Sequence, residues 1–264
     1  MSKFYKLLLG VIAVGAFALP FTAFAAIGFD NSSKSNAGAV STLTYSHTVN
    51  SNTNGALYCF ETAVDTNHRA IPSVTYAGVT MTNLVSQTNT PAMLGNRQMG
   101  MWRLLLPSTG ANNVVFTWGG AIGQTVAVAC TSFTGVNQST PEDGSAVQDI
   151  DTTPPYSTFT LSKTTTVDND WLVGFALNYG SNSNAVSAGT NTTIRQQAVG
   201  DTGNNALVTY DTNAAQTPTG SKSLNLSLSP SNDMSGFMYA IEPAASSPVV
   251  SWFNVIQSFI WGDW

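Results

Sequence analysis

The sequence predicts an all-β protein, an antiparallel β-sandwich of the jelly-roll or Ig-like kind with about a dozen strands. Two observations lead to this prediction. Short apolar or alternating runs recur roughly every 10–15 residues between Ser41 and Pro243, and Gly, Asn and Pro separate them. Between Ala26 and Pro243 no segment repeats its apolar residues with the period of a helix.

Residues 1–25 have the layout of a cleaved secretory signal. Two lysines precede an apolar run from Leu7 to Leu19, and Ala23-Phe24-Ala25 forms an A-x-A cleavage site. The run is shorter than the roughly 20 residues that a membrane-spanning helix needs. We therefore expect the mature chain to start at Ala26 and to be extracellular, either secreted or held at the cell surface.

The first strands follow a small, polar segment over residues 26–40, which we expect to be a flexible lead-in. Residues 43–49 alternate apolar with polar side chains, and residues 55–64 are apolar on both faces. Ala77-Gly78 between two apolar runs predicts a hairpin. The strands predicted in this half are 43–49, 55–64, 73–76, 79–85, 99–106, 113–118 and 125–133.

A polar, acidic stretch over residues 137–155 divides the strands into two halves. The strands predicted after it are 157–161, 171–177, 192–199, 206–210, 223–228 and 236–241. We expect one continuous sandwich domain over residues 41–243, because each half alone would make a thin core.

The segment 244–264 reads as a linker followed by a short apolar helix or tail. Its apolar residues follow the spacing of one helix face, and the candidate contacts are Trp252, Phe253, Ile256, Phe259 and Ile260. Three roles stay open: docking on the chain's own sandwich, contact with a partner or a second copy, and attachment to a membrane. The lack of Lys and Arg in this segment weakens the membrane role.

The two cysteines, Cys59 and Cys130, both lie in apolar strand-like runs. In an oxidising compartment such a pair can form one disulfide. The alternative is two buried free thiols, because the sequence does not show that the two strands adjoin. A metal site is less favoured, since a soft metal would need further Cys or His ligands nearby.

No residue set forms a catalytic motif, so we expect no enzyme activity and no cofactor. His47 lies within a strand and His68 in a loop, and neither accompanies a nucleophile motif. The acidic residues of the 142–151 loop, Glu142, Asp143, Asp149 and Asp151, raise the alternative of Ca²⁺ binding. A solvated acidic loop is the commoner outcome.

Aromatic residues are the remaining candidates for ligand contact. Trp102, Trp118 and Trp171 lie within or at the ends of predicted strands. Aromatic rings can stack on the apolar faces of sugars, but a sandwich core also needs large aromatic side chains. The core role is the more favoured of the two for each tryptophan.

Charge excludes several kinds of partner. Charged residues make up 9% of the chain, against roughly 25% in an average globular protein. Once Lys3 and Lys6 leave with the leader, seven basic residues stand against 14 acidic ones, a net charge of −7. An acidic chain with scattered basic residues argues against nucleic acid and anionic membrane surfaces.

Several strand motifs, taken in order, resemble a poorly characterised bacterial extracellular β-sandwich domain found as a module in large surface and adhesin-like proteins. The motifs lie at 42–48, 73–82, 101–107, 132–138, 170–174 and 238–243. The resemblance implies a sandwich fold and carries over no catalytic residue. Cys59 and Cys130 depart from the pattern, which favours a disulfide specific to this protein.

Two hypotheses for function follow. The first is a secreted or cell-surface binding module for glycans or other cell-surface components, with a role in adhesion. The alternative is a structural or assembly protein of the cell surface, whose apolar C-terminal tail docks on another subunit or the envelope.

Overall fold

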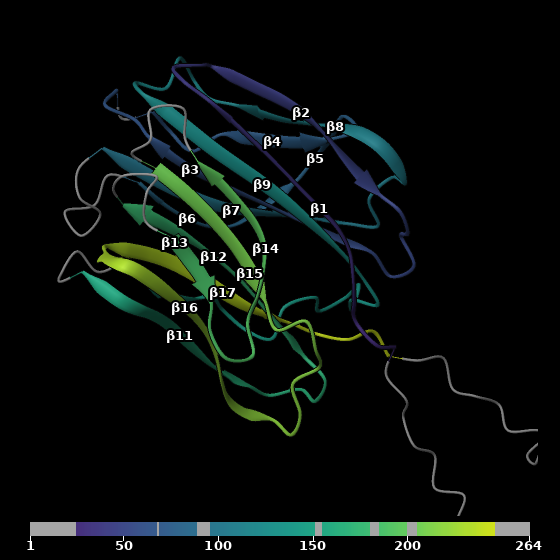
Figure 1. Cartoon of the computed structure of the whole chain (residues 1–264). Coiled ribbons are helices and arrows are strands. Elements are labelled where there is room, and N and C mark those ends of the chain that lie inside the picture. Colours follow the sequence, from purple (N-terminus) through teal and green to yellow (C-terminus); the bar gives the residue numbers. More distant parts are fainter. Residues whose placement is uncertain are drawn as a thin grey trace, which may run out of the picture. The chain divides into compact units, whose positions relative to one another are not determined.

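The structure is a computed structural model that describes residues 25–67, 69–88, 96–150, 155–179, 185–199 and 205–245 (Figure 1). These residues contain seventeen strands, all paired antiparallel, and no helix. The all-β prediction is therefore confirmed. The leader, His68, Asp151 and the tail after residue 245 lie outside the described residues.

The first half of the chain forms two sheets. The inner sheet has the order β1–β9–β3–β7–β6 and the outer sheet the order β2–β8–β4–β5. The inner strands are β1 (Gly28–Ala37), β9 (Thr125–Thr134), β3 (Ala56–Val64), β7 (Arg97–Leu105) and β6 (Thr82–Thr88). The outer strands are β2 (Thr42–Val49), β8 (Gly110–Thr117), β4 (Ser73–Tyr76) and β5 (Val79–Thr80).

Residues 26–40 are not a flexible lead-in, and that prediction was wrong. Strand β1 pairs with β9 from Gly28 opposite Thr134 to Ala37 opposite Val126. It is an edge strand with half-buried and exposed side chains, so backbone hydrogen bonds rather than apolar alternation hold it in place. Its polar sequence therefore gave no periodic signal.

The predicted hairpin at Ala77-Gly78 is present. Both residues have positive φ angles, 49° and 79°, as a two-residue hairpin turn with the right-handed twist requires. The run predicted as one strand, 79–85, divides after β5 at Met81. The chain crosses there from the outer sheet to β6 at the edge of the inner sheet.

The second half of the chain also forms two sheets. The inner sheet has the order β10–β17–β12–β15–β14 and the outer sheet the order β11–β16–β13. The inner strands are β10 (Val147–Asp149), β17 (Met234–Ile241), β12 (Trp171–Tyr179), β15 (Asn205–Asp211) and β14 (Thr193–Val199). The outer strands are β11 (Tyr156–Thr165), β16 (Gly220–Asn232) and β13 (Ala185–Ala188).

The two halves share one topology. If β5 is set aside, β1 to β4 correspond in order to β10 to β13, and β6 to β9 correspond to β14 to β17. The register agrees as well. Val49 at the end of β2 pairs with Gly110, and Thr165 at the end of β11 pairs with Gly220; both glycines have positive φ. The fold is therefore a structural duplication.

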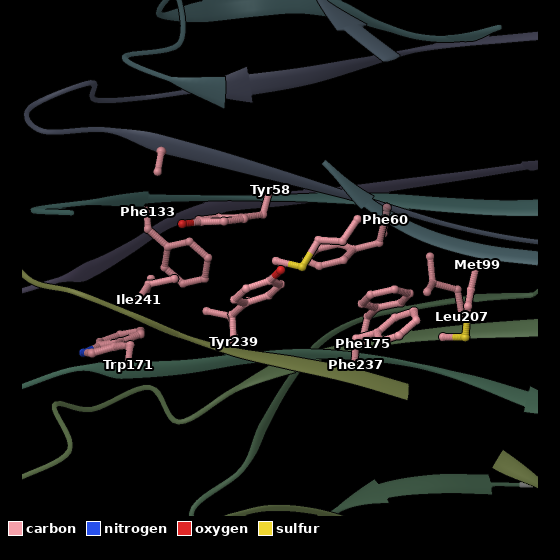
Figure 2. Close-up of a cluster of buried hydrophobic side chains, with 14 of the residues drawn as sticks. Tyr58, Phe60, Met99, Phe133, Trp171, Phe175, Leu207, Phe237, Tyr239 and Ile241 are labelled. Atoms are coloured by element: carbon pink, nitrogen blue, oxygen red, sulfur yellow. The ribbon is translucent and has the colours of Figure 1, made fainter. Parts of the chain in front are cut away.

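The four sheets of the unit Ala25–Ala244 stack as layers, with outer and inner sheets of the first half followed by inner and outer sheets of the second (Figure 1). Each half has its own core between its two sheets, and a third core joins the inner sheets. In that middle core Phe60 and Phe175 lie 5.0 Å apart between ring centroids, and Phe175 and Phe237 lie 5.3 Å apart (Figure 2).

The layers refine the expectation of one continuous sandwich. The 137–155 stretch separates two sandwiches, and they share the middle core that neither would have alone. Strands β3, β9, β12 and β17 are buried on both faces because they lie in the inner sheets. That position explains their continuous apolar sequences.

Candidate functional site

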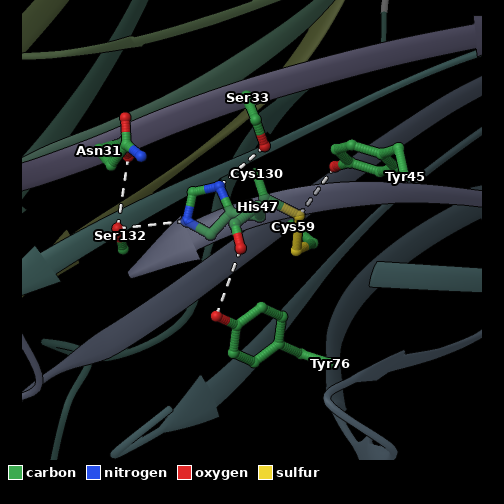
Figure 3. Close-up of a disulfide and its surroundings, with 8 residues drawn as sticks. All are labelled: Asn31, Ser33, Tyr45, His47, Cys59, Tyr76, Cys130 and Ser132. Carbon is green, nitrogen blue, oxygen red and sulfur yellow. Dashed lines mark hydrogen bonds between the residues drawn. A yellow bond between two sulfur atoms is a disulfide. The ribbon is translucent and has the colours of Figure 1, made fainter. Parts of the chain in front are cut away.

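Cys59 and Cys130 are joined by a disulfide, which resolves the alternative that the sequence left open (Figure 3). They face each other directly in the register of β3 and β9. Both are fully buried in the core of the first half. The hydroxyl of Tyr45 donates a hydrogen bond of 3.0 Å to the Cys130 sulfur, so the bridge is enclosed and structural.

His47 lies in a chain of buried and partly buried hydrogen bonds beside the disulfide (Figure 3). Ser132 Oγ donates to Asp30 Oδ2 over 2.7 Å, and His47 Nε2 in turn donates to Ser132 Oγ over 3.2 Å. His47 Nδ1 then accepts from Ser33 Oγ over 2.8 Å. Burial lowers the pKa of His47 to about 4, against the opposing effect of Asp30.

This arrangement is not a catalytic triad. The serine lies between the histidine and the aspartate, whereas a triad places the histidine between the other two. Ser132 and His47 are also shut off from solvent. The hydrogen bonds of His47 therefore hold the edges of the two sheets together, and His47 has a buried structural role.

The described acidic residues of the 142–151 loop take separate partners. Glu142 pairs with Arg103 and accepts from the Tyr58 hydroxyl over 3.0 Å. Asp143 accepts from the backbone and hydroxyl of Thr166. Asp149 accepts from the Tyr156 hydroxyl over 3.3 Å. Among the residues that the structure describes, no three His, Cys, Asp or Glu side chains gather as a metal site would require.

Two of the buried carboxyl groups, Glu61 and Asp170, have strongly raised pKa values, and the sequence indicated the burial of neither. Glu61 Oε1 accepts from Gln98 over 2.7 Å and from Trp118 over 3.2 Å, and burial raises the pKa of Glu61 to about 7. Asp170 is fully buried at the start of the second half's β12, and burial, with Asp143 adjacent, raises its pKa to about 8. Glu61 lies within an apolar strand and Asp170 lies in a turn, so neither stood out in the sequence as a buried titratable group.

The three candidate tryptophans are core residues. Trp102 is 2% exposed, Trp118 3% and Trp171 5%. Trp102 and Trp118 pack in the core of the first half, and Trp171 packs in the middle core. None of them can stack on a sugar, so any ligand contact must use other side chains.

The outer face of the β11–β16–β13 sheet is chemically uniform. On the paired stretch of β11 and β16, inward positions such as Phe159 and Leu224 are buried, and the alternate positions point outward. The outward side chains are all Ser, Thr or Asn: Thr158, Thr160, Ser162, Thr164, Ser221, Ser223, Asn225 and Ser227. Ser187 of β13 continues the face opposite Ser227.

Cross-strand hydrogen bonds order this face, which we call the β11 face. Thr160 Oγ1 donates to Asn225 Oδ1 over 2.7 Å, and the hydroxyls of Ser162 and Ser223 lie 2.8 Å apart. Outward side chains repeat about every 6.8 Å along a strand and about every 4.8 Å between strands. The β11 face is thus a regular, uncharged array of hydroxyl and amide groups.

The candidate contacts of the tail, Trp252, Phe253, Ile256, Phe259 and Ile260, lie outside the described residues. Within the described ranges, no helix has the length and apolar character needed to cross a membrane.

Comparisons with known proteins add no function. No family model matches the chain, and no curated protein matches it. Among solved structures, the chain is similar to one chain of the crystal structure of plant peptide RALF23 in complex with FER and LLG2. The TM-score is 0.25 and the sequence identity is 10%, and the match covers 84% of this chain and 92% of that chain. A likeness at this score carries no argument, so the resemblance to a bacterial surface domain stays a prediction.

Proposed function

We propose that the chain is a secreted or cell-surface β-sandwich binding module for neutral, hydroxyl-rich polymers, that is, for glycans. It acts by adhesion rather than by catalysis. The observation that carries the proposal is the β11 face, on which every outward position of the paired β11 and β16 stretch is Ser, Thr or Asn.

The chemistry of the β11 face fits a polysaccharide. Hydroxyl and amide groups both donate and accept hydrogen bonds, as sugar hydroxyls do. Each group on the face can therefore act as donor or as acceptor toward a sugar hydroxyl. No outward side chain of the paired stretch is charged, because Lys163 and Lys222 stand at inward positions, so no outward charge has to be desolvated when an uncharged polymer covers the face. Single contacts of this kind are weak, but a regular array meets a repeating polymer at many points.

Two further features support an extracellular setting. The leader-like residues 1–25 predict export. The Cys59–Cys130 disulfide is of the kind that persists in oxidising compartments. Both agree with a ligand outside the cell.

The proposal is tested by affinity electrophoresis of the full chain in gels that contain dextran, xylan or glucomannan. We expect at least one neutral polysaccharide to retard the protein. Retardation should persist at high salt, because an uncharged contact is not screened. Alginate, an anionic polymer, should not retard it.

Variants locate the contact. Thr160→Lys places a charged side chain in the centre of the β11 face and should weaken the apparent affinity at least tenfold. Thr82→Lys is the matched control, since Thr82 is also an exposed strand threonine but lies on β6, at the edge of an inner sheet. Because each lysine changes the mobility by itself, retardation is measured relative to a gel without polysaccharide. Equal retardation of both variants and the wild type in every gel contradicts the proposal.

A second candidate, the structural or assembly protein, is favoured by the way the chain enters and leaves the compact unit. The backbone N–H of Ala25 donates to the carbonyl of Ala244 over 2.9 Å, and Pro243 bridges to Val136. The first and the last described residues of the compact unit therefore lie next to each other.

This candidate is tested by size-exclusion chromatography with light scattering on the chain from residue 26 to 264 and on a version ending at residue 243. Association of the longer protein alone supports the assembly role of the tail. Equal monomeric mass for both contradicts it.

A further inference from the structure

We infer that the chain carries a second glycan-binding face on β2 and β8, turned away from the β11 face, and that one molecule therefore bridges two polymer strands. The inference rests on the proposed function of the β11 face. It adds a second site and a cross-linking activity that the first site alone does not supply.

The duplication places β2 of the first half where β11 lies in the second. The paired glycines at the ends of these strands fix the register, so Thr44 corresponds to Thr160. In this register all four outward residues of the two strands are identical, as Thr42 with Thr158, Thr44 with Thr160, Ser46 with Ser162 and Thr48 with Thr164.

The inward residues of the same two strands have all diverged. Leu43, Tyr45, His47 and Val49 correspond to Phe159, Leu161, Lys163 and Thr165. One of these inward positions makes unrelated polar contacts in the two halves, since His47 bonds to serine hydroxyls and Lys163 donates to the carbonyl of Ser145. The cores have therefore been repacked while the outward row kept its chemistry.

Core packing cannot explain that identity. An outward side chain of an outer sheet contacts solvent and its neighbours on the same face, and surface substitutions of this kind usually change stability little. A shared ligand explains why the same hydroxyls stand at the same positions. Strand β8 completes the face with Asn113 and Thr117 opposite Ser46 and Thr42.

The β2 face is similar to the β11 face but not uniform. On β8, Ala111 and Val115 stand among the outward positions, opposite Thr48 and Thr44. Neither residue is charged, so the β2 face is also free of charge on the paired stretch. We expect it to bind the same class of polymer with lower affinity than the β11 face.

The two faces point in opposite directions. The β2–β8–β4–β5 sheet packs on one side of the four layers and the β11–β16–β13 sheet on the other (Figure 1). Three gaps of about 10 Å between stacked sheets separate them by about 30 Å. A single polymer strand lying flat on one face cannot lie on the other, so two occupied faces hold two strands together.

Cross-linking of a neutral polysaccharide tests the inference. The full chain is mixed with the dextran, xylan or glucomannan that retards it in affinity electrophoresis, and light scattering is followed as protein is added. A bridging protein gives scattering that rises, passes through a maximum and falls when protein is in excess, because separate protein molecules, each bound through one face only, then fill the polymer sites.

Three variants make the test specific. Thr44→Lys and Thr160→Lys each block one face, and each should still bind the polysaccharide but lose the scattering maximum. The double variant should lose binding, and Thr82→Lys should behave as the wild type. Light scattering without polysaccharide establishes that each protein is monomeric under the same conditions.

The outcomes separate the inference from the function on which it rests. If the wild type binds polysaccharide without cross-linking it, or if Thr44→Lys cross-links as well as the wild type, the second face is refuted and the β11 face stands. If the wild type binds none of the polysaccharides, the proposed function itself is refuted.

Discussion

Asp30 and Asp143 make the same contact in the two halves of the fold. Asp30 accepts the backbone N–H of Asn50, which follows β2, and Asp143 accepts the backbone N–H of Thr166, which follows β11. Asn50 and Thr166 occupy equivalent positions one residue beyond the paired ends of these strands. Each aspartate therefore ties the start of its half to the end of the outer-sheet strand.

Replacing either aspartate should destabilise the protein by a similar amount. Asp30→Asn and Asp143→Asn each keep the side-chain volume but turn an acceptor oxygen into a donor, so one N–H or hydroxyl at a partly buried contact loses its partner at a cost of about 1 kcal/mol. The two effects should add, because the aspartates lie in different halves and accept hydrogen bonds from different residues. Urea unfolding of both single variants and the double variant measures this. A double variant no less stable than the worse single one would contradict the equivalence.

The disulfide should contribute substantially to stability. It joins residues 71 apart in sequence, and closing a loop of that size in the unfolded chain is worth roughly 4 kcal/mol. We expect Cys59→Ala with Cys130→Ala to lower the urea midpoint strongly. Reduction of the wild type should reproduce the effect, and the double variant should not respond to reductant. An unchanged midpoint would show that the bridge does not form in solution.

Glu61 should make the fold less stable as the pH rises. Burial raises its pKa in the folded chain from 4.5 to about 7, so between these values the unfolded chain loses the proton first and unfolding becomes easier. Glu61→Gln keeps an acceptor for Gln98 and Trp118 and removes the titration. Relative to the wild type, the variant should gain on the order of 3 kcal/mol between pH 4.5 and pH 7. Parallel stability profiles for the two proteins would contradict a buried titrating carboxyl.

His47, in contrast, should make the fold less stable as the pH falls. Its pKa falls from 6.5 to about 4 in the fold, so as the pH drops between these values the unfolded chain takes up the proton first and the wild type loses stability. His47→Gln can still donate and accept within the serine network but does not titrate. The stability difference between wild type and variant should shift by on the order of 3 kcal/mol between pH 6.5 and pH 4. A difference independent of pH would mean that His47 is not held neutral by the fold.

Strand periodicity predicted the fold class because most strands lie in buried or half-buried positions. It failed for β1, an edge strand whose polar residues show no alternation. It also could not reveal the duplication, because the inward residues of β2 and β11 differ and only the outward residues match. Knowing which residues point outward requires the register, and the register comes from the structure.

The site was harder to predict than the fold. Aromatic residues were the natural candidates for ligand contact, yet the structure buries Trp102, Trp118 and Trp171. The β11 face consists of Ser, Thr and Asn, which are common in turns and on any solvated sheet. No single residue marks such a face; its uniformity appears only when β11 and β16 are paired.

The most direct measurement of the central claim is an amide chemical-shift titration of the full chain with short neutral oligosaccharides cut from dextran, xylan and glucomannan. The account predicts saturable shifts at Thr160, Ser162 and Asn225 on the β11 face, with weaker shifts at Thr44 and Ser46 on the β2 face. Resonances of the inner-sheet edge strand β6 should stay in place. Shifts confined to other parts of the chain, or no shifts with any of the three sugars, would contradict it.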